Sequence, residues 1–120
     1  MKVDPLNILI NEKFKFNKKL YLISGNEISL INEIKYRIIS DYKQRQFGYQ
    51  RVNNFAEIIT GGELFGDKKI YYIDGGIDKN TNLEDFFDSE DVYMVILENS
   101  PKIRSIKENL SKNKNCCVID

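Results

Sequence analysis

The stretch Leu20–Ser29, with the sequence LYLISGNEIS, decides the fold. Its first residues, Leu20–Ser24, form a short apolar run that ends at a glycine, which predicts a strand buried on both faces in the middle of a parallel sheet. A helix should follow directly, because Asn26 can serve as its N-cap or Ser24 can pair with Glu27 in a capping box. A strand, a turn and a helix in this order indicate an α/β domain.

The residues after this turn continue the alternation of strands and helices. Apolar side chains recur at the 3.6-residue spacing of an amphipathic helix that should end before Gly48. These apolar positions are Leu30, Ile31, Ile34, Ile38 and Tyr42. Further strands are predicted at Tyr49–Asn53, Lys69–Ile73, Val92–Leu97 and Cys116–Ile119. Short helices are predicted around Phe55 and Ile58, within Asn80–Ser89, and around Ile106 with Pro101 at its first turn. Strict alternation predicts a three-layer α/β/α domain with a five-stranded parallel sheet.

The length and the apolar pattern bound the class of protein. A chain of 120 residues suits one domain with one core, so we expect residues 1–120 to form a single domain. Because the sequence stops within or just after its last strand, we expect a fragment of a longer protein. No apolar run approaches the roughly 20 residues of a membrane helix, and the N-terminus has no signal-peptide pattern. We therefore expect a cytoplasmic protein without membrane contact.

The charge balance favours a protein partner over direct nucleic-acid binding. Lysine plus arginine number 18 and aspartate plus glutamate number 18, which leaves no net charge. A domain that binds DNA by itself usually carries a basic excess. Four lysines precede the first predicted strand, and a solvated loop is the simplest explanation for them. They are Lys13, Lys15, Lys18 and Lys19.

The cysteines and the absence of histidine limit the possible chemistry. A chain without histidine has no histidine zinc site and no imidazole for catalysis. Cys116 and Cys117 are neighbours on a predicted strand and should point to opposite faces, so they are poorly placed to share a metal or to bond to each other. We expect two small strand side chains, one of them in the core.

The first turn, Ser24–Ser29, lies where folds of this kind bind ligands, but it lacks the residues of a phosphate site. A P-loop needs several glycines, a lysine for the phosphates and a hydroxyl for magnesium. This turn has one glycine, no lysine, and Glu27 where a phosphate would lie. A carboxylate there would repel the anion. We therefore expect no nucleotide hydrolysis, no catalytic site, no cofactor and no metal.

Two other functions fit the alternation of elements. A receiver-like signalling domain would use Asp74, after the third predicted strand, as its phosphoacceptor. Such a site needs more carboxylates after the first strand, where Asn26 and Glu27 are poor substitutes, and Asp74 before two glycines is more simply a turn residue. An enzyme with an unrecognised site is the second alternative, although no nucleophile and base are suitably spaced.

A separate motif, TGGELFGDKKIYYI at Thr60–Ile73, places two large apolar residues in a loop. Leu64 and Phe65 lie between a glycine pair and a Gly-Asp turn. Such side chains either fold back as a lid on the core or protrude as an anchor for a partner. The chemistry of the residues alone favours the lid.

Three segments together resemble the N-terminal domain of bacterial DNA polymerase III delta subunits. They are LYLISGNEISLINEI, ELFGDKKIYYI and VYMVILENSPKIRSIKENL, in the order of that family and over most of the chain. The first is similar to the family's strand, glycine-acidic turn and helix. The second is similar to its Leu-Phe loop, basic residue and apolar strand, and the third to its fourth strand and following helix.

The resemblance implies an AAA+-type, P-loop-related domain without a functional P-loop. It implies a clamp-loader delta subunit that binds and opens the β sliding clamp during DNA replication, as a non-catalytic subunit of the DNA-directed DNA polymerase III holoenzyme, a nucleotidyltransferase complex. Its partners would be the clamp, other loader subunits and, through the complex, DNA. The resemblance assigns the family's clamp-binding Leu-Phe pair to Leu64 and Phe65. In the family's clamp-binding pattern, Thr60 takes the position of a glutamine and Glu63 takes that of a small or apolar residue.

Overall fold

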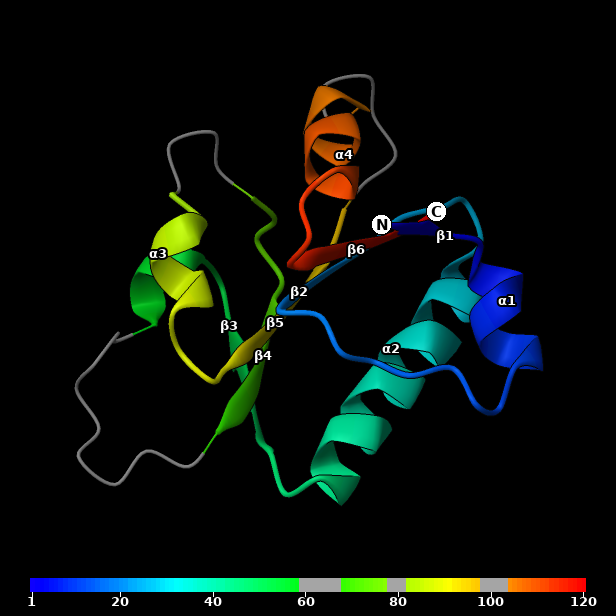
Figure 1. Cartoon of the computed structure of the whole chain (residues 1–120), viewed down its shortest axis with the longest axis horizontal. Coiled ribbons are helices and arrows are strands. Elements are labelled where there is room, and N and C mark those ends of the chain that lie inside the picture. Colours follow the sequence, from blue (N-terminus) through cyan, green and yellow to red (C-terminus); the bar gives the residue numbers. More distant parts are fainter. Residues whose placement is uncertain (59–67, 78–81, 98–103) are drawn as a thin grey trace.

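The computed structural model describes residues 1–58, 68–77, 82–97 and 104–120. Within these residues the strands are β1 (Lys2–Val3), β2 (Leu20–Ile23), β3 (Gly48–Val52), β4 (Lys69–Ile73), β5 (Val92–Ile96) and β6 (Cys116–Ile119). The helices are α1 (Pro5–Ile10), α2 (Ile28–Gln44), the 3₁₀ helix η1 (Phe55–Glu57), α3 (Glu84–Phe87) and α4 (Arg104–Ser111). The strands form one sheet in the order β1-β6-β2-β5-β4-β3, and every pair is parallel (Figure 1).

Helices cover both faces of this sheet. One core cluster gathers side chains from α1, α2 and one face of the strands, and a second gathers side chains from η1, α3, α4 and the other face. Figure 1 shows α1 and α2 on one side of the sheet and α3 and α4 on the other. The predicted α/β class with a parallel sheet between helices is therefore confirmed, but the predicted number of strands is wrong, because the described sheet has six.

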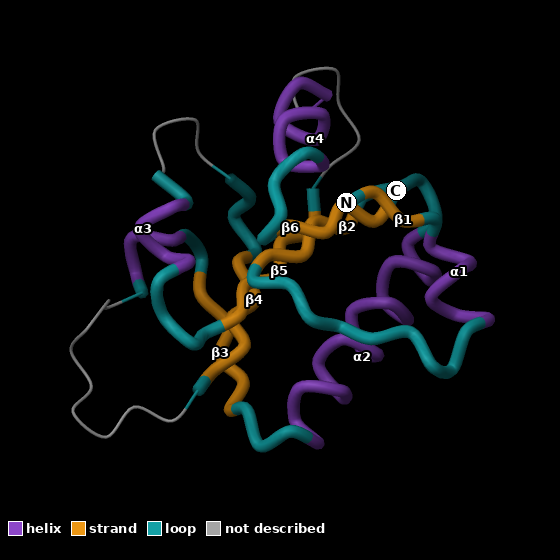
Figure 2. The backbone as a smooth tube through the Cα atoms, in the orientation of Figure 1, coloured by secondary structure: helices purple, strands orange, loops and turns teal. Residues whose placement is uncertain are grey.

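The additional strand lies near the start of the chain, where no regular structure was predicted. Lys2 and Val3 pair in parallel with Val118 and Ile119, so the first and last strands lie side by side (Figure 2). Two residues are too short to show a pattern in the sequence. The helix α1 could have been found, because the carboxylate of Asp4 caps it through the Leu6 amide at 2.9 Å and proline occupies its first position.

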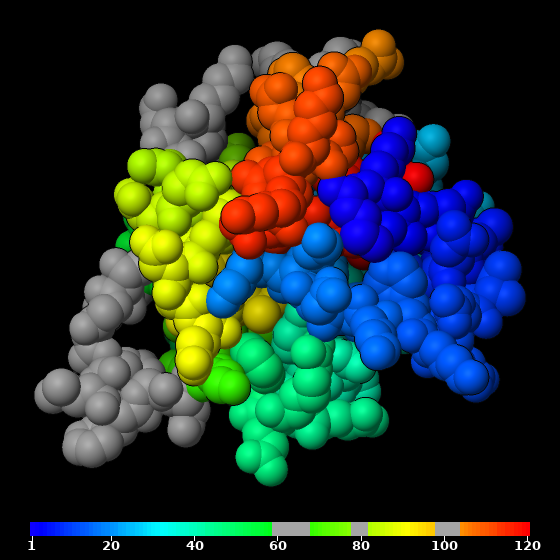
Figure 3. All heavy atoms as spheres, viewed as in Figure 1, coloured from blue at the N-terminus to red at the C-terminus, as the bar shows by residue number. Residues whose placement is uncertain are grey.

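The helix α1 and the segment that follows it pack across α2, as the blue spheres of Figure 3 show. Arg37 donates a hydrogen bond to the carbonyl of Ile8 at 2.6 Å, and Arg45 donates to the carbonyl of Phe16 at 2.7 Å. The hydroxyl of Tyr42, which is 2.7 Å from that of Tyr21, also reaches the carbonyl of Phe16. These contacts satisfy main-chain carbonyls that have no strand partner and fix the segment to the helix.

The lysines before β2 divide into two pairs. Lys13 and Lys15 are exposed, as expected for a solvated loop. Lys18 and Lys19 are partly buried and donate to the carbonyls of Lys114 and Ser89. The second pair therefore ties the start of β2 to neighbouring loops.

The start of α2 differs from both predicted caps. The helix begins at Ile28, its N-cap is Glu27, and the Glu27 side chain makes no capping hydrogen bond. Ser24 cannot cap the helix because its hydroxyl is buried and faces Lys107 of α4. Gly25 adopts a φ of +151°, a conformation that other residues rarely adopt, and this turns the chain between strand and helix.

Both cysteines are buried, which corrects the expectation of one core residue. Cys116 is fully buried in one core cluster and Cys117 is 1% exposed in the other. The prediction that they point to opposite faces is confirmed. The second thiol is covered because helices pack on both faces of β6, which the strand pattern alone does not reveal.

The buried thiols should be inert in the native protein. Burial raises the pKa of Cys116 to about 12 and that of Cys117 to about 11. At pH 8 we expect Ellman's reagent to label both thiols at least about 10³-fold more slowly than in 6 M guanidinium, because the thiolate is the reactive form. Absorbance at 412 nm measures the two rates. Fast labelling of the native chain would show that β6 is accessible from one face.

Candidate functional site

The carboxyl ends of β2, β5 and β6 form the place where a parallel α/β sheet binds ligands. The chain leaves β2 toward α2 on one face and reaches α4 from β5 on the opposite face (Figure 1). Because β2 and β5 are neighbours and the helices that follow them lie on opposite faces, the carboxyl ends of these two strands form the switch point of the sheet. The turn at Ser24–Ser29 follows β2 and therefore lies at this switch point.

A polar network with a buried hydroxyl at its centre lies at the carboxyl ends of β2 and β6. The ammonium of Lys107 lies 3.0 Å from a carboxylate oxygen of Asp120 and 3.4 Å from the hydroxyl of Ser24. Ser24 is 2% exposed, and its amide donates to the carbonyl of Ile119 at 3.0 Å. Partial burial alone would raise the pKa of Asp120, but hydrogen bonds from Lys107 and Ser24 lower it. An ammonium group beside the turn is thus held by a carboxylate of the chain itself.

The cavity beneath the turn is small and largely apolar. It has a volume of about 100 Å³. Its lining comprises Pro5, Ile23, Ser24, Gly25, Asn26, Glu27, Leu30, Ile31, Ile34 and Asp120. Small-molecule sites typically have volumes of roughly 300–1,000 Å³. The cavity is therefore too small for a nucleotide, and the carboxylate of Glu27 at the N-terminus of α2 adds charge that opposes a phosphate.

The network makes a testable contribution to stability at low pH. Because the folded pKa of Asp120 lies below its unfolded value, this contribution is present above about pH 4 and is lost as pH falls through the folded pKa. We expect Lys107→Met to destabilise the protein by up to about 1 kcal/mol at pH 7 and by less at pH 3. Urea unfolding at both pH values measures this. Lys112→Met, at an exposed site on α4's C-terminal side, is the control and should show no such dependence.

Sequence reasoning missed this network, and no local signal could have found it. Lys107 lies 83 residues from Ser24 and 13 from Asp120 in the chain. Only the parallel pairing of β2 with β6 brings Ser24 and Asp120 together, at the ends of neighbouring strands. The helix α4 then places Lys107 above both.

The four residues predicted to bind the clamp lie outside the described residues. They are Thr60, Glu63, Leu64 and Phe65. The described residues on either side are well anchored. Ile58 is buried in the core under η1, and the carbonyl of Lys68 accepts a hydrogen bond from Gly48 at 2.8 Å. The segment therefore connects the helical layer beside η1 with the amino end of β4.

Asp74 lies in the turn after β4, in an ion pair rather than an acidic cluster. One of its carboxylate oxygens, Oδ2, lies 2.7 Å from Nε and 2.6 Å from Nη2 of Arg51. Receiver-type folds follow the order 2-1-3-4-5, in which the first and third strands are neighbours. Counted from β2, the third strand is β4, and β5 separates the two. This topology disfavours the signalling alternative.

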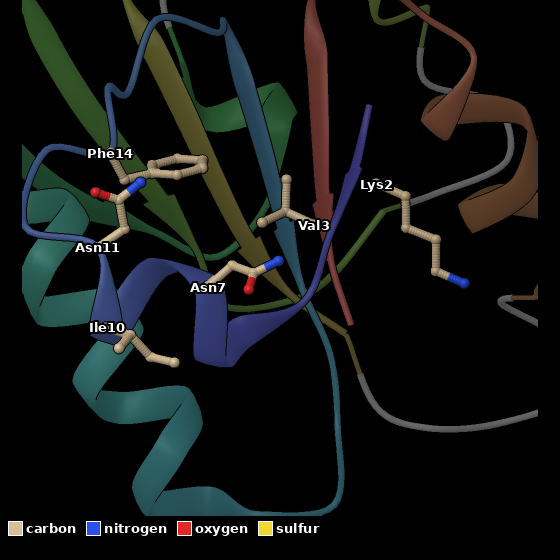
Figure 4. Close-up of a pocket in the computed structure, with 6 residues that line it drawn as sticks. All are labelled: Lys2, Val3, Asn7, Ile10, Asn11 and Phe14. Atoms are coloured by element: carbon tan, nitrogen blue, oxygen red, sulfur yellow. The ribbon is translucent and has the colours of Figure 1, made fainter.

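A second, wider depression lies between β1 and α1. It has a volume of about 590 Å³ and is lined by Lys2, Val3, Asn7, Ile10, Asn11 and Phe14. Figure 4 shows Lys2 pointing away from the other five side chains. The remaining lining side chains do not titrate, so they provide neither an acid nor a base for catalysis.

The described ranges contain no group of three histidine, cysteine, aspartate or glutamate side chains arranged to hold a metal ion. No helix in the same ranges combines the length and apolar character that crossing a bilayer requires. No protein-family model, no curated protein and no solved structure matches this chain.

Proposed function

We propose that this chain is the N-terminal domain of a bacterial DNA polymerase III delta subunit, which binds and opens the β sliding clamp without an ATPase of its own. The structural observation that carries this proposal is the polar network at the carboxyl ends of β2 and β6. At the edge where a parallel α/β sheet usually binds a ligand, the ammonium of Lys107 is already paired with Asp120 and bonded to Ser24. Such a domain is suited to act as a scaffold for a partner.

The contact with the clamp is assigned to Leu64 and Phe65, supported by the resemblance of the second sequence segment. Two neighbouring large apolar side chains can fill a hydrophobic pocket on a partner. Thr60 and Glu63 precede them and replace the glutamine and the small residue of the family pattern. The apolar pair therefore supplies most of the binding energy in this proposal.

Opening of the ring follows from differential binding. A ligand shifts an equilibrium only by the difference between its affinities for the two states. The delta domain would bind the clamp more tightly when one ring interface is open than when the ring is closed. ATP bound to other loader subunits would drive the cycle, and DNA would be contacted through the assembled complex.

Calorimetric titration of a bacterial β clamp with this chain tests the proposal. We expect saturable binding, and no heat from a parallel titration of the chain with Mg-ATP. Absence of binding at about 100 μM of each protein would overturn the clamp assignment. Binding of ATP would overturn the claim that this domain has no nucleotide site of its own.

A further inference from the structure

Aromatic rings and cations gather where α2 runs beside the edge strand β3, and we call this the tyrosine–cation surface. It consists of Lys35, Tyr36 and Lys43 of α2, Tyr49 and Arg51 of β3, and Tyr72 of β4. Sequence analysis did not detect it, because its members come from three elements.

The sheet register explains how these residues meet. Arg51 is the neighbour of Tyr72, and Tyr49 is the neighbour of Ile70, whose side chain lies in the core under α2. Alternate residues of a strand share a face, so Tyr49 and Arg51 lie on the α2 side of the sheet. β3 is the outermost strand, and its first four residues are exposed.

The cations lie against the rings. The ammonium of Lys35 is 4.3 Å from the centre of the Tyr72 ring, and the guanidinium of Arg51 is 5.8 Å from the same ring. The ammonium of Lys43 is 5.7 Å from the Tyr49 ring. These cation–π contacts hold the charged groups in place without neutralising them.

The charges on this surface are unbalanced toward the positive. Arg51 pairs with Asp74, but neither Lys35 nor Lys43 forms an ion pair with any carboxylate of the described chain. Partial burial and the nearby Arg51 lower the pKa of Lys35. The site therefore holds positive charge that an anion would stabilise, although the whole chain carries no net charge.

We propose that the tyrosine–cation surface binds single-stranded nucleic acid, with phosphates at Lys35 and Lys43 and bases stacked on Tyr36 and Tyr49. The Tyr36 side chain is 67% exposed and Tyr49 is 38% exposed, so both rings are available to bases. Surfaces that bind single strands combine cations for the backbone with aromatic rings for the bases.

The rings favour nucleic acid over an acidic peptide as the occupant. An acidic peptide would neutralise both lysines but would leave the exposed rings of Tyr36 and Tyr49 with nothing to stack on them. Every base has a flat face that can stack, which makes such binding tolerant of sequence. A duplex hides these faces, so the unpaired strand is the better fit.

This inference does not rest on the proposed clamp contact. The tyrosine–cation surface consists of described residues on α2, β3 and β4, whereas the clamp contact is assigned to Leu64 and Phe65. Loss of one activity with retention of the other would separate the two proposals.

Fluorescence anisotropy with a labelled dT12 oligonucleotide tests the inference. At 50 mM salt we expect saturable binding that weakens with added salt. With two phosphates contacted, the slope of log K against log salt should be about −1.4. A matched dT12–dA12 duplex should bind more weakly, because its bases are not available for stacking.

Two variants and a control locate the binding. Tyr36→Ala and Lys43→Glu should each weaken binding of dT12 at least about fivefold, because they remove a stacking ring and reverse a charge. Lys112→Glu makes the same change of charge at an exposed position on the C-terminal side of α4 and should leave affinity within about twofold. Circular dichroism confirms that each variant is folded.

Three outcomes would overturn the inference. The first is absence of saturable binding at 50 mM salt. The second is an equal loss of affinity in Lys43→Glu and Lys112→Glu, which would indicate attraction to net charge alone. The third is displacement of dT12 by polyglutamate at equal charge concentration together with an unchanged affinity in Tyr36→Ala, which would make the surface an acidic-protein site.

Discussion

Replacing Leu64 and Phe65 together with alanine should abolish binding to the β clamp while the fold is retained. Apolar anchors at the centre of an interface contribute roughly 2–4 kcal/mol each. Even with incomplete additivity, the double variant should lose at least about 10³-fold in affinity, since 1.4 kcal/mol corresponds to a factor of ten. Calorimetric titration with the clamp measures the loss.

The matched control removes a similar apolar pair elsewhere. Leu6 and Ile10 of α1 are 55% and 75% exposed and lie one helical turn apart. The variant Leu6→Ala with Ile10→Ala should bind the clamp as the unmodified chain does. If a general loss of apolar surface weakened binding, both double variants would fail to the same degree.

Thermal unfolding decides between an anchor and a lid for Leu64 and Phe65. Truncation of an exposed anchor changes the stability of the protein little, whereas truncation of a large core side chain lowers it by about 2–5 kcal/mol. A double variant that unfolds at a much lower temperature would mean that the pair belongs to the core. The clamp assignment of these two residues would then be wrong.

Gly75→Ala should be strongly destabilising, for a reason that lies in the main chain. A Cβ atom at Gly75 would lie 2.1 Å from the carbonyl oxygen of Asn53, and the Gly75 amide donates to that same oxygen at 2.8 Å. Neither group can rotate away, so the turn after β4 must move from the end of β3. The hydrogen bond from Asp74 to Val52 at 3.0 Å lies next to the clash and would be strained.

We expect a loss of about 2–4 kcal/mol for Gly75→Ala, typical of a backbone clash combined with weakened hydrogen bonds. Gly48→Ala is the matched control in the same pair of strands. Its Cβ would meet the Lys69 side chain at 3.5 Å, an ordinary contact, so stability should change by less than about 1 kcal/mol. Urea unfolding compares the two, and equal midpoints would show that the turn relaxes without cost.

The central strands were predictable because their apolar runs are long and continuous. The predicted strands at Lys69–Ile73 and Cys116–Ile119 match β4 and β6. Side chains buried on both faces leave no polar alternation, and this is the pattern of a central parallel strand. β3 was a weaker prediction, displaced by one residue, because four of its five residues are exposed at the edge of the sheet.

The helix start and the cysteines show where local rules failed. Ser24 has the right type and spacing for a capping box, yet its hydroxyl faces Lys107. Capping propensity describes the hydrogen bonds that a side chain can make with its neighbours in sequence. Here the hydroxyl contacts Lys107, which is distant in sequence, and does not cap the helix. Only one of the two cysteines was expected in the core, because a single strand does not reveal that helices cover both of its faces.

The amino-acid sequence by itself determined the α/β class, the parallel alternation, the turn after the first long strand and the Leu64–Phe65 motif, because each depends on neighbours within a few residues. Only the tertiary structure decided the strand order, the network of Lys107 with Ser24 and Asp120, and the tyrosine–cation surface. These features join residues far apart in the chain, and such pairs meet only through the packing of helices on both faces of the sheet.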